Sequence, residues 1–100
     1  MTNENVELIE LRAAIDNVDS QIVRLLNERV EIAVKMGVLK TKLKKPIRDE
    51  NREAEVKRKL SLLTGGESLS EYHIHTIYET IMHVCLEIQQ NLNATIEAQN

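Results

Sequence analysis

A repeating apolar pattern between Leu8 and Leu43 constrains this chain more than any other feature. Apolar residues recur in an unbroken three-then-four alternation, and no proline interrupts the segment. Such spacing places one stripe along one face of a single helix and suits packing against other helices at a shallow angle. Arg29 is the one charged member of the stripe. The stripe consists of Leu8, Leu11, Ile15, Val18, Ile22, Leu25, Arg29, Ile32, Met36, Leu39 and Leu43.

The length of this helix predicts a partner chain. At ~1.5 Å per residue the segment spans about 55 Å. A compact chain of 100 residues has a radius of gyration of only ~13 Å. The remaining residues cannot cover the whole stripe, and an uncovered row of leucine and isoleucine side chains invites a second subunit. The sequence therefore predicts an oligomer, most simply a two-fold homodimer.

Composition narrows the class of protein. One hundred residues make one domain, assigned to residues 1–100, and its core must be aliphatic because only two residues are aromatic. The single cysteine, Cys85, excludes an intrachain disulfide and suits a reducing compartment. Glu4, Glu7 and Glu10 stand where a signal peptide needs basic and then apolar residues. With a net charge of −3 and no apolar run of membrane-spanning length, we expect a cytoplasmic protein that binds neither nucleic acid nor membrane.

Capping and turn residues divide the chain into three predicted helices. The first begins near Asn3–Asn5 and ends before Pro46, because the residue before a proline avoids helical angles. Asp49 is a good N-cap for the second helix, which reaches about Leu63 and is ended by Thr-Gly-Gly at residues 64–66. We expect the buried side of this helix to consist of Ala54, Val56, Lys57, Leu60 and Leu63.

A capping box at Ser68 and Glu71 predicts the start of the third helix. Its apolar stripe consists of Ile74, Ile77, Tyr78, Ile81, Cys85, Ile88 and Leu92. After Leu92 the chain becomes polar, and we expect residues 93–100 to form a frayed tail. The predicted fold class is all-α, with three helices per chain and a very long first helix.

Several polar residues lie on or beside the predicted packing faces, where a helical bundle does not need them. Arg29 is the clearest case, since an unpaired buried guanidinium is costly. It either pairs with a carboxylate across the interface or belongs to an anion site. Cys85 and Gln89 are four residues apart, as are Asp49 and Glu53, so each pair shares a helix face. Like Arg29, four residues recur on or beside packing faces: Arg12, Lys40, Arg52 and Gln89. Together these residues would suit a small dianion.

Helix geometry indicates how the cations could meet. Arg29 and Lys40 are ~16 Å apart along one helix, close enough for both side chains to reach one ligand. Arg12 lies ~25 Å from Arg29 and cannot reach the same pocket in its own chain. Antiparallel pairing of two first helices about a dyad near Ile22 or Val23 would bring Arg12 of the partner subunit beside that pocket. The predicted dimer therefore has two pockets, each completed by both subunits.

In this order and spacing the residues resemble the all-helical chorismate mutases, most closely the mutase domain that begins the bifunctional enzymes of phenylalanine biosynthesis. The resemblance covers Glu4 to Gln90 and spans all three predicted helices. It is carried by Leu11-Arg12, Leu26-Asn27-Glu28-Arg29, Lys40, Pro46-Ile47-Arg48-Asp49, Arg52-Glu53 and Gln89-Gln90. It implies an intertwined homodimer that converts chorismate to prephenate by a Claisen rearrangement, with no cofactor, metal or covalent intermediate.

The resemblance also implies how the reaction is accelerated. A pericyclic step needs the flexible dianion held in its compact conformer, and it needs stabilisation of charge as the C–O bond breaks. Arg29 and Arg12 of the partner subunit would bind the two carboxylates of chorismate. Lys40 and Gln89 would donate hydrogen bonds to the ether oxygen as it gains negative charge.

The remaining site residues take supporting roles by the same resemblance. Glu53 would accept a hydrogen bond from the ring hydroxyl, helped by the Arg52 backbone. Asp49 and the Arg52 side chain would shape the lid side of the pocket. Cys85 departs from the family pattern, where a serine helps to bind a carboxylate. Because a thiol is a poorer donor, a space-filling role for Cys85 is an equally open interpretation.

Other functions stay open at this point. His75, Glu79 and His83 repeat every four residues on one helix face and could bind a metal, although only three ligands on an exposed helix make a weak site. A second enzymatic hypothesis is an isochorismate-pyruvate lyase on the same scaffold. A third hypothesis is a non-enzymatic helical dimerisation module, in which the polar residues form interface salt bridges.

Overall fold

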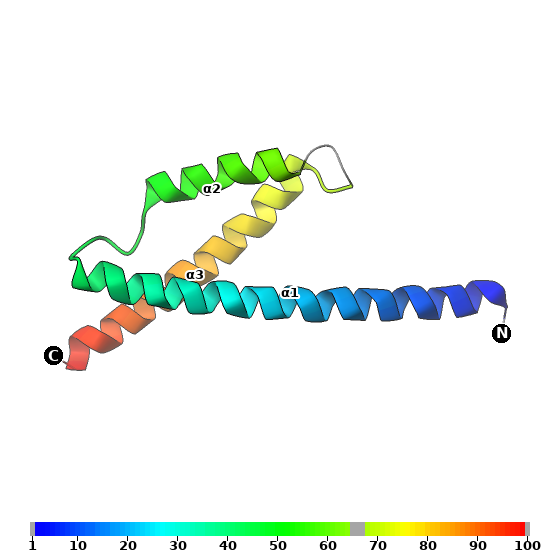
Figure 1. The fold of residues 1–100 in the computed structure, drawn as a ribbon, viewed down its shortest axis with the longest axis horizontal. Helices are drawn as coiled ribbons and strands as arrows, with labels where there is room; N and C mark the ends of the chain where they lie inside the picture. Colours follow the sequence, from blue (N-terminus) through cyan, green and yellow to red (C-terminus); the bar gives the residue numbers. More distant parts are fainter. Residues whose placement is uncertain (1, 65–67, 100) are drawn as a thin grey trace. The chain divides into compact units, whose positions relative to one another are not determined.

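The computed structural model describes residues 2–64 and 68–99, which form three α-helices (Figure 1). These are α1 (Asn3–Lys42), α2 (Glu50–Leu63) and α3 (Glu71–Gln99). Within these described ranges there is no strand, so the predicted all-α class with a long first helix is confirmed. The same residues contain no helix that is long and apolar enough to cross a membrane.

The chain divides into two compact units, Met1–Glu31 and Ile32–Asn100. The first unit consists of the N-terminal part of α1 alone. The second unit contains the C-terminal part of α1 together with α2 and α3. The assignment of residues 1–100 to one domain stays a prediction.

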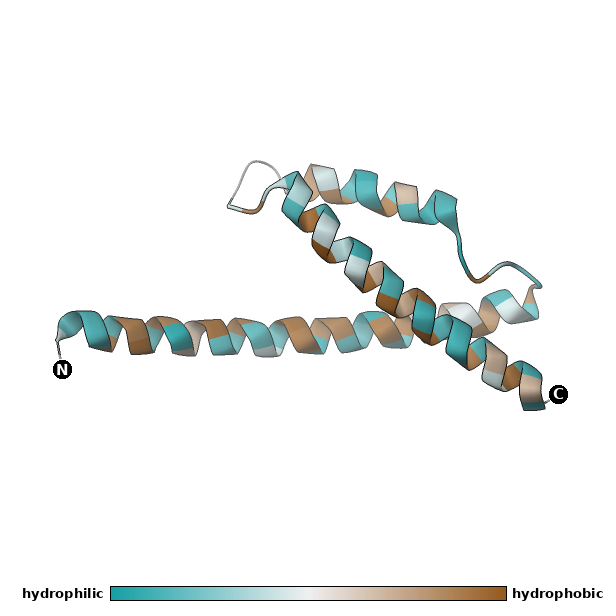
Figure 2. Cartoon of the chain, turned by 180° about the vertical axis from the view of Figure 1, so that it is seen from behind, coloured by the Kyte–Doolittle hydropathy of each residue, from teal (hydrophilic) through white to brown (hydrophobic). Residues whose placement is uncertain are grey.

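The apolar stripe of α1 is exposed in the single chain. All ten apolar residues of the stripe, nine in α1 and Leu43 directly after it, keep between 42% and 60% of their surface accessible, from Met36 at the lower end to Ile15 at the upper. Figure 2 shows these hydrophobic positions recurring among hydrophilic ones along α1. A row of large aliphatic side chains with this exposure is typical of a surface that another chain covers.

The C-terminus of α1 is closed by a Schellman arrangement that ends the helix before Pro46, as predicted. The Lys45 N–H donates to the Lys40 carbonyl at 2.8 Å, and the Lys44 N–H donates to the Thr41 carbonyl at 3.1 Å. Lys44 has a φ of 56°, the left-handed conformation that this motif requires. Residues with a Cβ are disfavoured in this left-handed conformation, and glycine is the usual residue at this position.

Replacing Lys44 with glycine is expected to raise the free energy of unfolding by about 1 kcal/mol, because glycine adopts a positive φ without steric cost. Urea unfolding of the two proteins measures the difference. Lys45→Gly is the matched control, since it removes the same charge one residue later, where φ is not positive. If Lys44→Gly stabilises no more than the control, the left-handed conformation is not what limits the parent protein.

The helix caps agree with the sequence at α2 and differ at α3. Asp49 caps α2, with φ −125° and its side chain accepting the Arg52 N–H at 3.0 Å, as predicted. At the other end the Thr64 N–H donates to the Leu60 carbonyl. Gly65 and Gly66, predicted to end α2, lie outside the described residues. The predicted capping box at Ser68 and Glu71 is wrong by two residues. Ser70 is the cap, and its Oγ accepts the His73 N–H at 3.1 Å.

Helices α2 and α3 pack against each other over a small core. Leu60 and Cys85 are buried, but Leu63, predicted on the buried side of α2, is 79% exposed. Ala54, predicted on the same side, is also exposed, as is Ile77 on α3. Helical periodicity treats every apolar position on a face as equally buried, whereas one short helix and one longer helix bury only the positions nearest their contact.

A polar contact joins the C-terminal part of α3 to α1. The Thr41 hydroxyl lies 2.8 Å from Asn93 Oδ1 and 3.0 Å from the Gly37 carbonyl, and Asn93 Nδ2 donates to Glu97 at 3.3 Å. Residues 93–99 are helical, so the expected frayed tail is not what the structure shows. Hydropathy does not predict that α3 continues beyond Leu92, because the contacts of Asn93 are polar.

Candidate active site

Lys40 lies in the last turn of α1, where the following loop folds back onto it. Its Nζ donates to the Ile47 carbonyl at 2.8 Å, and the residue is half-buried. Lys40 and Asp49 line the same open cleft of about 520 Å³, beside Arg48 and Glu50. An ammonium group has three donors, so the Ile47 contact leaves two for a ligand. The Schellman turn and the loop therefore place a partly desolvated cation at the edge of this cleft.

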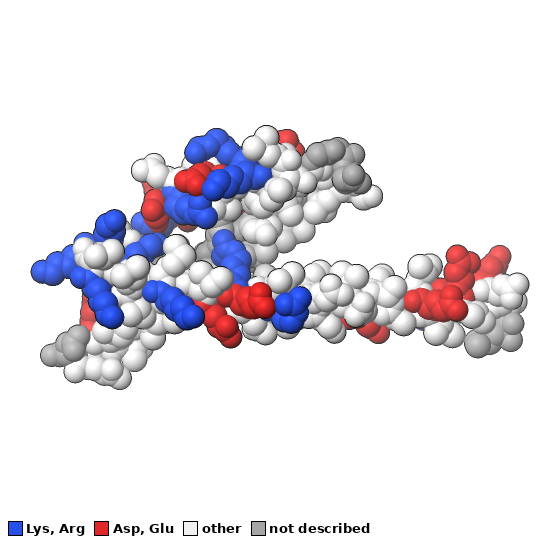
Figure 3. Space-filling view, viewed as in Figure 1, with Lys and Arg blue, Asp and Glu red and all other residues white. Residues whose placement is uncertain are grey.

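Lys and Arg side chains gather over the C-terminal end of α1 and over α2, as Figure 3 shows. Within this cluster Arg52 Nη1 pairs with Glu55 Oε1 at 2.7 Å, and Lys59 reaches the same carboxylate at 2.9 Å. The hydrogen bond and charge of Lys59, together with the charge of Arg52, lower the pKa of Glu55. In the single chain the side chain of Arg52, a predicted site residue, is therefore ion-paired with Glu55 of the same helix.

Glu53 is paired with an arginine that the sequence did not single out. Its Oε2 lies 3.6 Å from Arg48 Nη2, and Arg48 Nε lies 3.9 Å from Glu50. Glu53 also lines a cavity of about 270 Å³ between α2 and α3, where Lys57 and Glu79 pair at 3.3 Å. Arg48 borders both this cavity and the cleft at Lys40. Nothing in the spacing of Arg48 along the chain indicates a carboxylate partner, so the sequence does not predict its pairing with Glu53.

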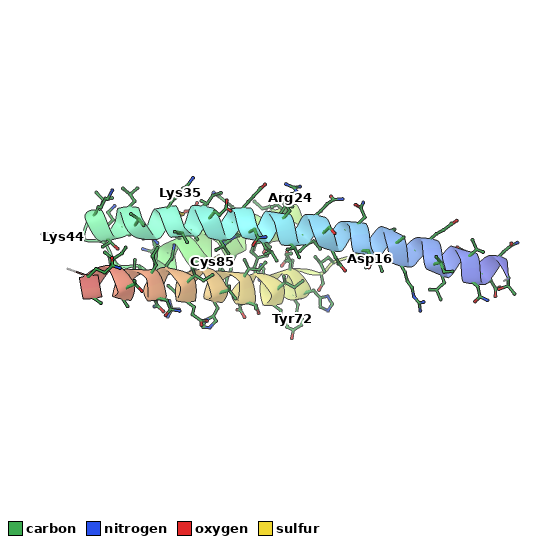
Figure 4. The ribbon with its side chains drawn as sticks, turned by 90° about the horizontal axis from the view of Figure 1, so that it is seen from below. Asp16, Arg24, Lys35, Lys44, Tyr72 and Cys85 are labelled. Atoms are coloured by element: carbon green, nitrogen blue, oxygen red, sulfur yellow. The ribbon has the colours of Figure 1, made fainter. Side chains whose placement is uncertain are left out.

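Gln89 is buried where α3 contacts α1. Its side chain is 7% exposed, and Nε2 donates to the Ala33 carbonyl at 2.7 Å. Cys85 lies one turn earlier on the same face of α3, is also buried, and faces the C-terminal part of α1 (Figure 4). The prediction that these two residues share a packing face is confirmed.

The second unit brings together part of the predicted site. Lys40 and Asp49 share one cleft, and Glu53 lies in the neighbouring cavity. Arg52, Cys85 and Gln89 line neither of these two spaces. The two remaining predicted residues, Arg12 and Arg29, belong to the first unit, and their convergence on the others stays a prediction.

The histidines of α3 do not form a metal site in the part of the chain that the structure describes. His75 is half-buried against α2, with Nε2 2.9 Å from Ser61 Oγ and 3.1 Å from the Lys57 carbonyl. Glu79 pairs with Lys57, and His83 pairs with Glu87 at 3.7 Å. Within the described ranges no group of three or more His, Cys, Asp or Glu side chains could hold a metal ion. The expectation that His75 lies on an exposed face is wrong, because it packs between two helices.

Comparison with known proteins places the chain in an enzyme family. The family model for chorismate mutase type II matches residues 11–90. The chain belongs to this family, and the resemblance expected from its sequence is confirmed.

Particular relatives give the same result. The chain is 39% identical over 90 residues to the bifunctional chorismate mutase/prephenate dehydratase of Aquifex aeolicus, covering 86% of this chain and 25% of that protein. It is 34% identical over 92 residues to the Escherichia coli enzyme of the same name, covering 92% of this chain and 24% of that protein. The chain thus spans about a quarter of the length of these curated relatives.

Two solved structures share the fold. The form II chorismate mutase of Thermus thermophilus superposes with a TM-score of 0.80 at 27% identity, covering 84% of this chain and 94% of that one. The chorismate mutase of Helicobacter pylori, solved in complex with prephenate, gives a TM-score of 0.78 at 30% identity, covering 86% and 92%.

Proposed function

We propose that the protein is a chorismate mutase, an isomerase of aromatic amino acid biosynthesis that converts chorismate to prephenate. In this Claisen rearrangement the ether C–O bond breaks as a new C–C bond forms, within one molecule and without a covalent intermediate. The observation that carries the proposal is the family match over residues 11–90, which extends through all three helices. Following chorismate loss and prephenate formation with purified protein tests it directly.

The proposed roles of Lys40 and Gln89 agree with their contacts. Both would donate to the ether oxygen. Each side chain already donates one hydrogen bond to a backbone carbonyl and keeps further N–H groups for a ligand. Negative charge develops on that oxygen only as the bond breaks, so these two donors would favour the transition state. In this proposal no cofactor and no metal takes part.

The other roles follow the family resemblance. Glu53 would accept from the ring hydroxyl, and its carboxylate lies 3.6 Å from Arg48 Nη2. Arg52 and Asp49 would border the lid side, and Asp49 would do so while it caps α2. Arg29 would bind one carboxylate of chorismate.

The proposed enzyme is an intertwined cytoplasmic homodimer. The exposed apolar stripe of α1 supports a second copy as its cover, since ten large aliphatic side chains on one helix face are costly in water. Arg12 of the partner subunit would then bind the second carboxylate, because ~25 Å separates Arg12 from Arg29 along one helix.

Mixing two inactive variants tests the shared site. Arg12→Ala and Arg29→Ala homodimers should each be inactive, whereas every heterodimer should contain one site with both arginines intact. After random subunit exchange, about a quarter of the parent activity is expected, because half of the dimers are then mixed and each carries one working site of two. A mixture that stays inactive after verified exchange would exclude a site that crosses the interface.

The alternative functions make different predictions. An isochorismate-pyruvate lyase would release salicylate and pyruvate from isochorismate, and assaying both substrates separates the two activities. A purely structural dimerisation module would leave chorismate unchanged. The relatives reported above favour neither alternative.

Cys85→Ser is expected to be tolerated and to lower KM by about twofold, because serine is nearly isosteric and the better donor. The matched control is Cys85→Ala, which removes the donor and leaves KM unchanged or raised. Steady-state kinetics and melting temperatures of the three proteins give the answer. A large loss of turnover in the folded Cys85→Ser protein would show that the thiol itself has a specific role.

A further inference from the structure

Gly37 leaves space for Gln89. It lies in the interior of α1 and is buried, and a Cβ built on it would lie 3.2 Å from Gln89 Cγ and 3.4 Å from Gln89 Cβ. Those separations are shorter than the ~3.5–4.0 Å at which carbon atoms pack most favourably. Glycine is among the poorest helix formers, and this helical position needs no positive φ. Close approach of Gln89 is therefore the physical reason for glycine here.

The Ala33 carbonyl selects one orientation of the Gln89 amide. Nε2 lies 2.7 Å from this oxygen, and a flipped amide would place Oε1 against it, oxygen to oxygen. In an α-helix the same carbonyl also accepts the N–H of the fourth residue onward, which is Gly37. A carbonyl oxygen has two lone pairs and can accept both bonds. Because the side chain is 7% exposed, little water is available to support the flipped amide.

We infer that Gly37 and the Ala33 carbonyl together hold the Gln89 amide with its nitrogen in the donor orientation that the reaction uses. The Ala33 bond occupies one N–H of Nε2 and leaves the second for the ether oxygen. Gly37 is thus a positioning residue, which acts through Gln89 and does not touch the substrate. This inference rests on the proposed function.

The test is Gly37→Ala, which adds one methyl group against Gln89. The displaced amide should lower kcat about tenfold, because small misplacements of a catalytic group are costly, while KM changes by no more than about twofold. Alanine is the better helix former, so the melting temperature should hold within a few degrees unless the clash is severe. A parent-like kcat in Gly37→Ala would overturn the inference.

A second background separates positioning from a general effect on α1. In Gln89→Ala protein there is no long side chain to displace, so adding Gly37→Ala should leave the residual kcat unchanged. An equal loss of kcat in both backgrounds would also overturn the inference. If Gly37→Ala alone does not fold, the double variant should fold, since Gln89 Cγ, the atom nearest to the added methyl group, is gone. Failure of both would show that Gly37 does not accommodate Gln89.

The same set of proteins distinguishes this inference from the proposed function. A folded parent without chorismate turnover refutes the proposed function and, with it, any positioning for the reaction. Whether Gly37 leaves the space that Gln89 occupies is still decided by the melting temperatures. A Gly37→Ala effect that depends on the residue at position 89 supports the packing, and an effect independent of that residue refutes it.

Discussion

Lys40→Met should lower kcat about a hundredfold and change KM much less. The ether oxygen carries little charge in bound chorismate and gains it as the C–O bond breaks, so a donor aimed at it acts mainly on the transition state. Loss of one such donor costs about 3 kcal/mol, equivalent to about a hundredfold in rate. Methionine keeps an unbranched side chain of similar length and removes only the charge and the donors. Steady-state kinetics on chorismate separate the two constants.

Lys42→Met is the matched control for this prediction. It removes the same charge from the same last turn of α1, at an exposed position with no proposed role, and should leave both constants unchanged. Because Lys40 Nζ also holds the Ile47 carbonyl, melting temperatures should be compared alongside the kinetics. A rise in KM at constant kcat would place Lys40 on a carboxylate that is charged throughout the reaction. For Arg29→Ala, by contrast, we expect a large rise in KM together with lower turnover, because the substrate is also misoriented.

Local patterns predicted the elements of this fold better than the contacts between them. The unbroken stripe and Pro46 predicted α1 and its end, and Asp49 predicted the start of α2, because each depends on a few neighbouring residues. The cap of α3 was misplaced because two serines stand within three residues and only Ser70 reaches the His73 N–H. Burial was overestimated at Leu63, since burial depends on a partner helix that local periodicity does not reveal.

The residues proposed for the site could be named from the sequence, but their contacts could not. Spacing and resemblance indicate Gln89 and Glu53 as site residues. They do not indicate that Gln89 contacts the Ala33 carbonyl or that Glu53 contacts the Arg48 guanidinium. The residue type of Ala33 indicates no role at the site, because the atom that contacts Gln89 is a backbone oxygen. Such contacts depend on side-chain rotamers and on how the helices pack, and neither can be read directly from one sequence.

Gln89→Glu should make activity depend on low pH. The parent amide is neutral at every working pH, so parent activity should hold from mildly acidic to neutral conditions. In the variant an ionised carboxylate would have no N–H for the ether oxygen and would face the Ala33 carbonyl, which accepts at 2.7 Å in the parent. Burial and this opposing oxygen both disfavour the charged form and raise the pKa of the introduced carboxyl above its ordinary value of about 4.3. Only the protonated form can donate, and its single O–H has to point at the ether oxygen for activity to return.

The sign of the effect on stability follows from the same raised pKa. Below about pH 4.3 the carboxyl is protonated in both the folded and the unfolded chain, and the variant incurs no ionisation penalty. As pH rises through the folded-state pKa the unfolded chain gives up its proton more readily, so the free energy of unfolding decreases. Turnover of Gln89→Glu should be about a hundredfold lower than that of the parent at neutral pH, and it should recover on acidification. The melting temperature of the variant should rise over the same pH range.

The decisive measurement is the pH profile of kcat for Gln89→Glu beside the parent and Gln90→Glu. Gln90 is the exposed neighbour on α3 and introduces the same charge one residue away, so its profile should follow the parent. A flat Gln89→Glu profile with full neutral activity would mean that position 89 does not face the breaking bond. The placement of the ether-oxygen donor on α3 would then have to be abandoned, and with it the role inferred for Gly37. A profile that falls with rising pH only in Gln89→Glu would place the proton-dependent donor at position 89.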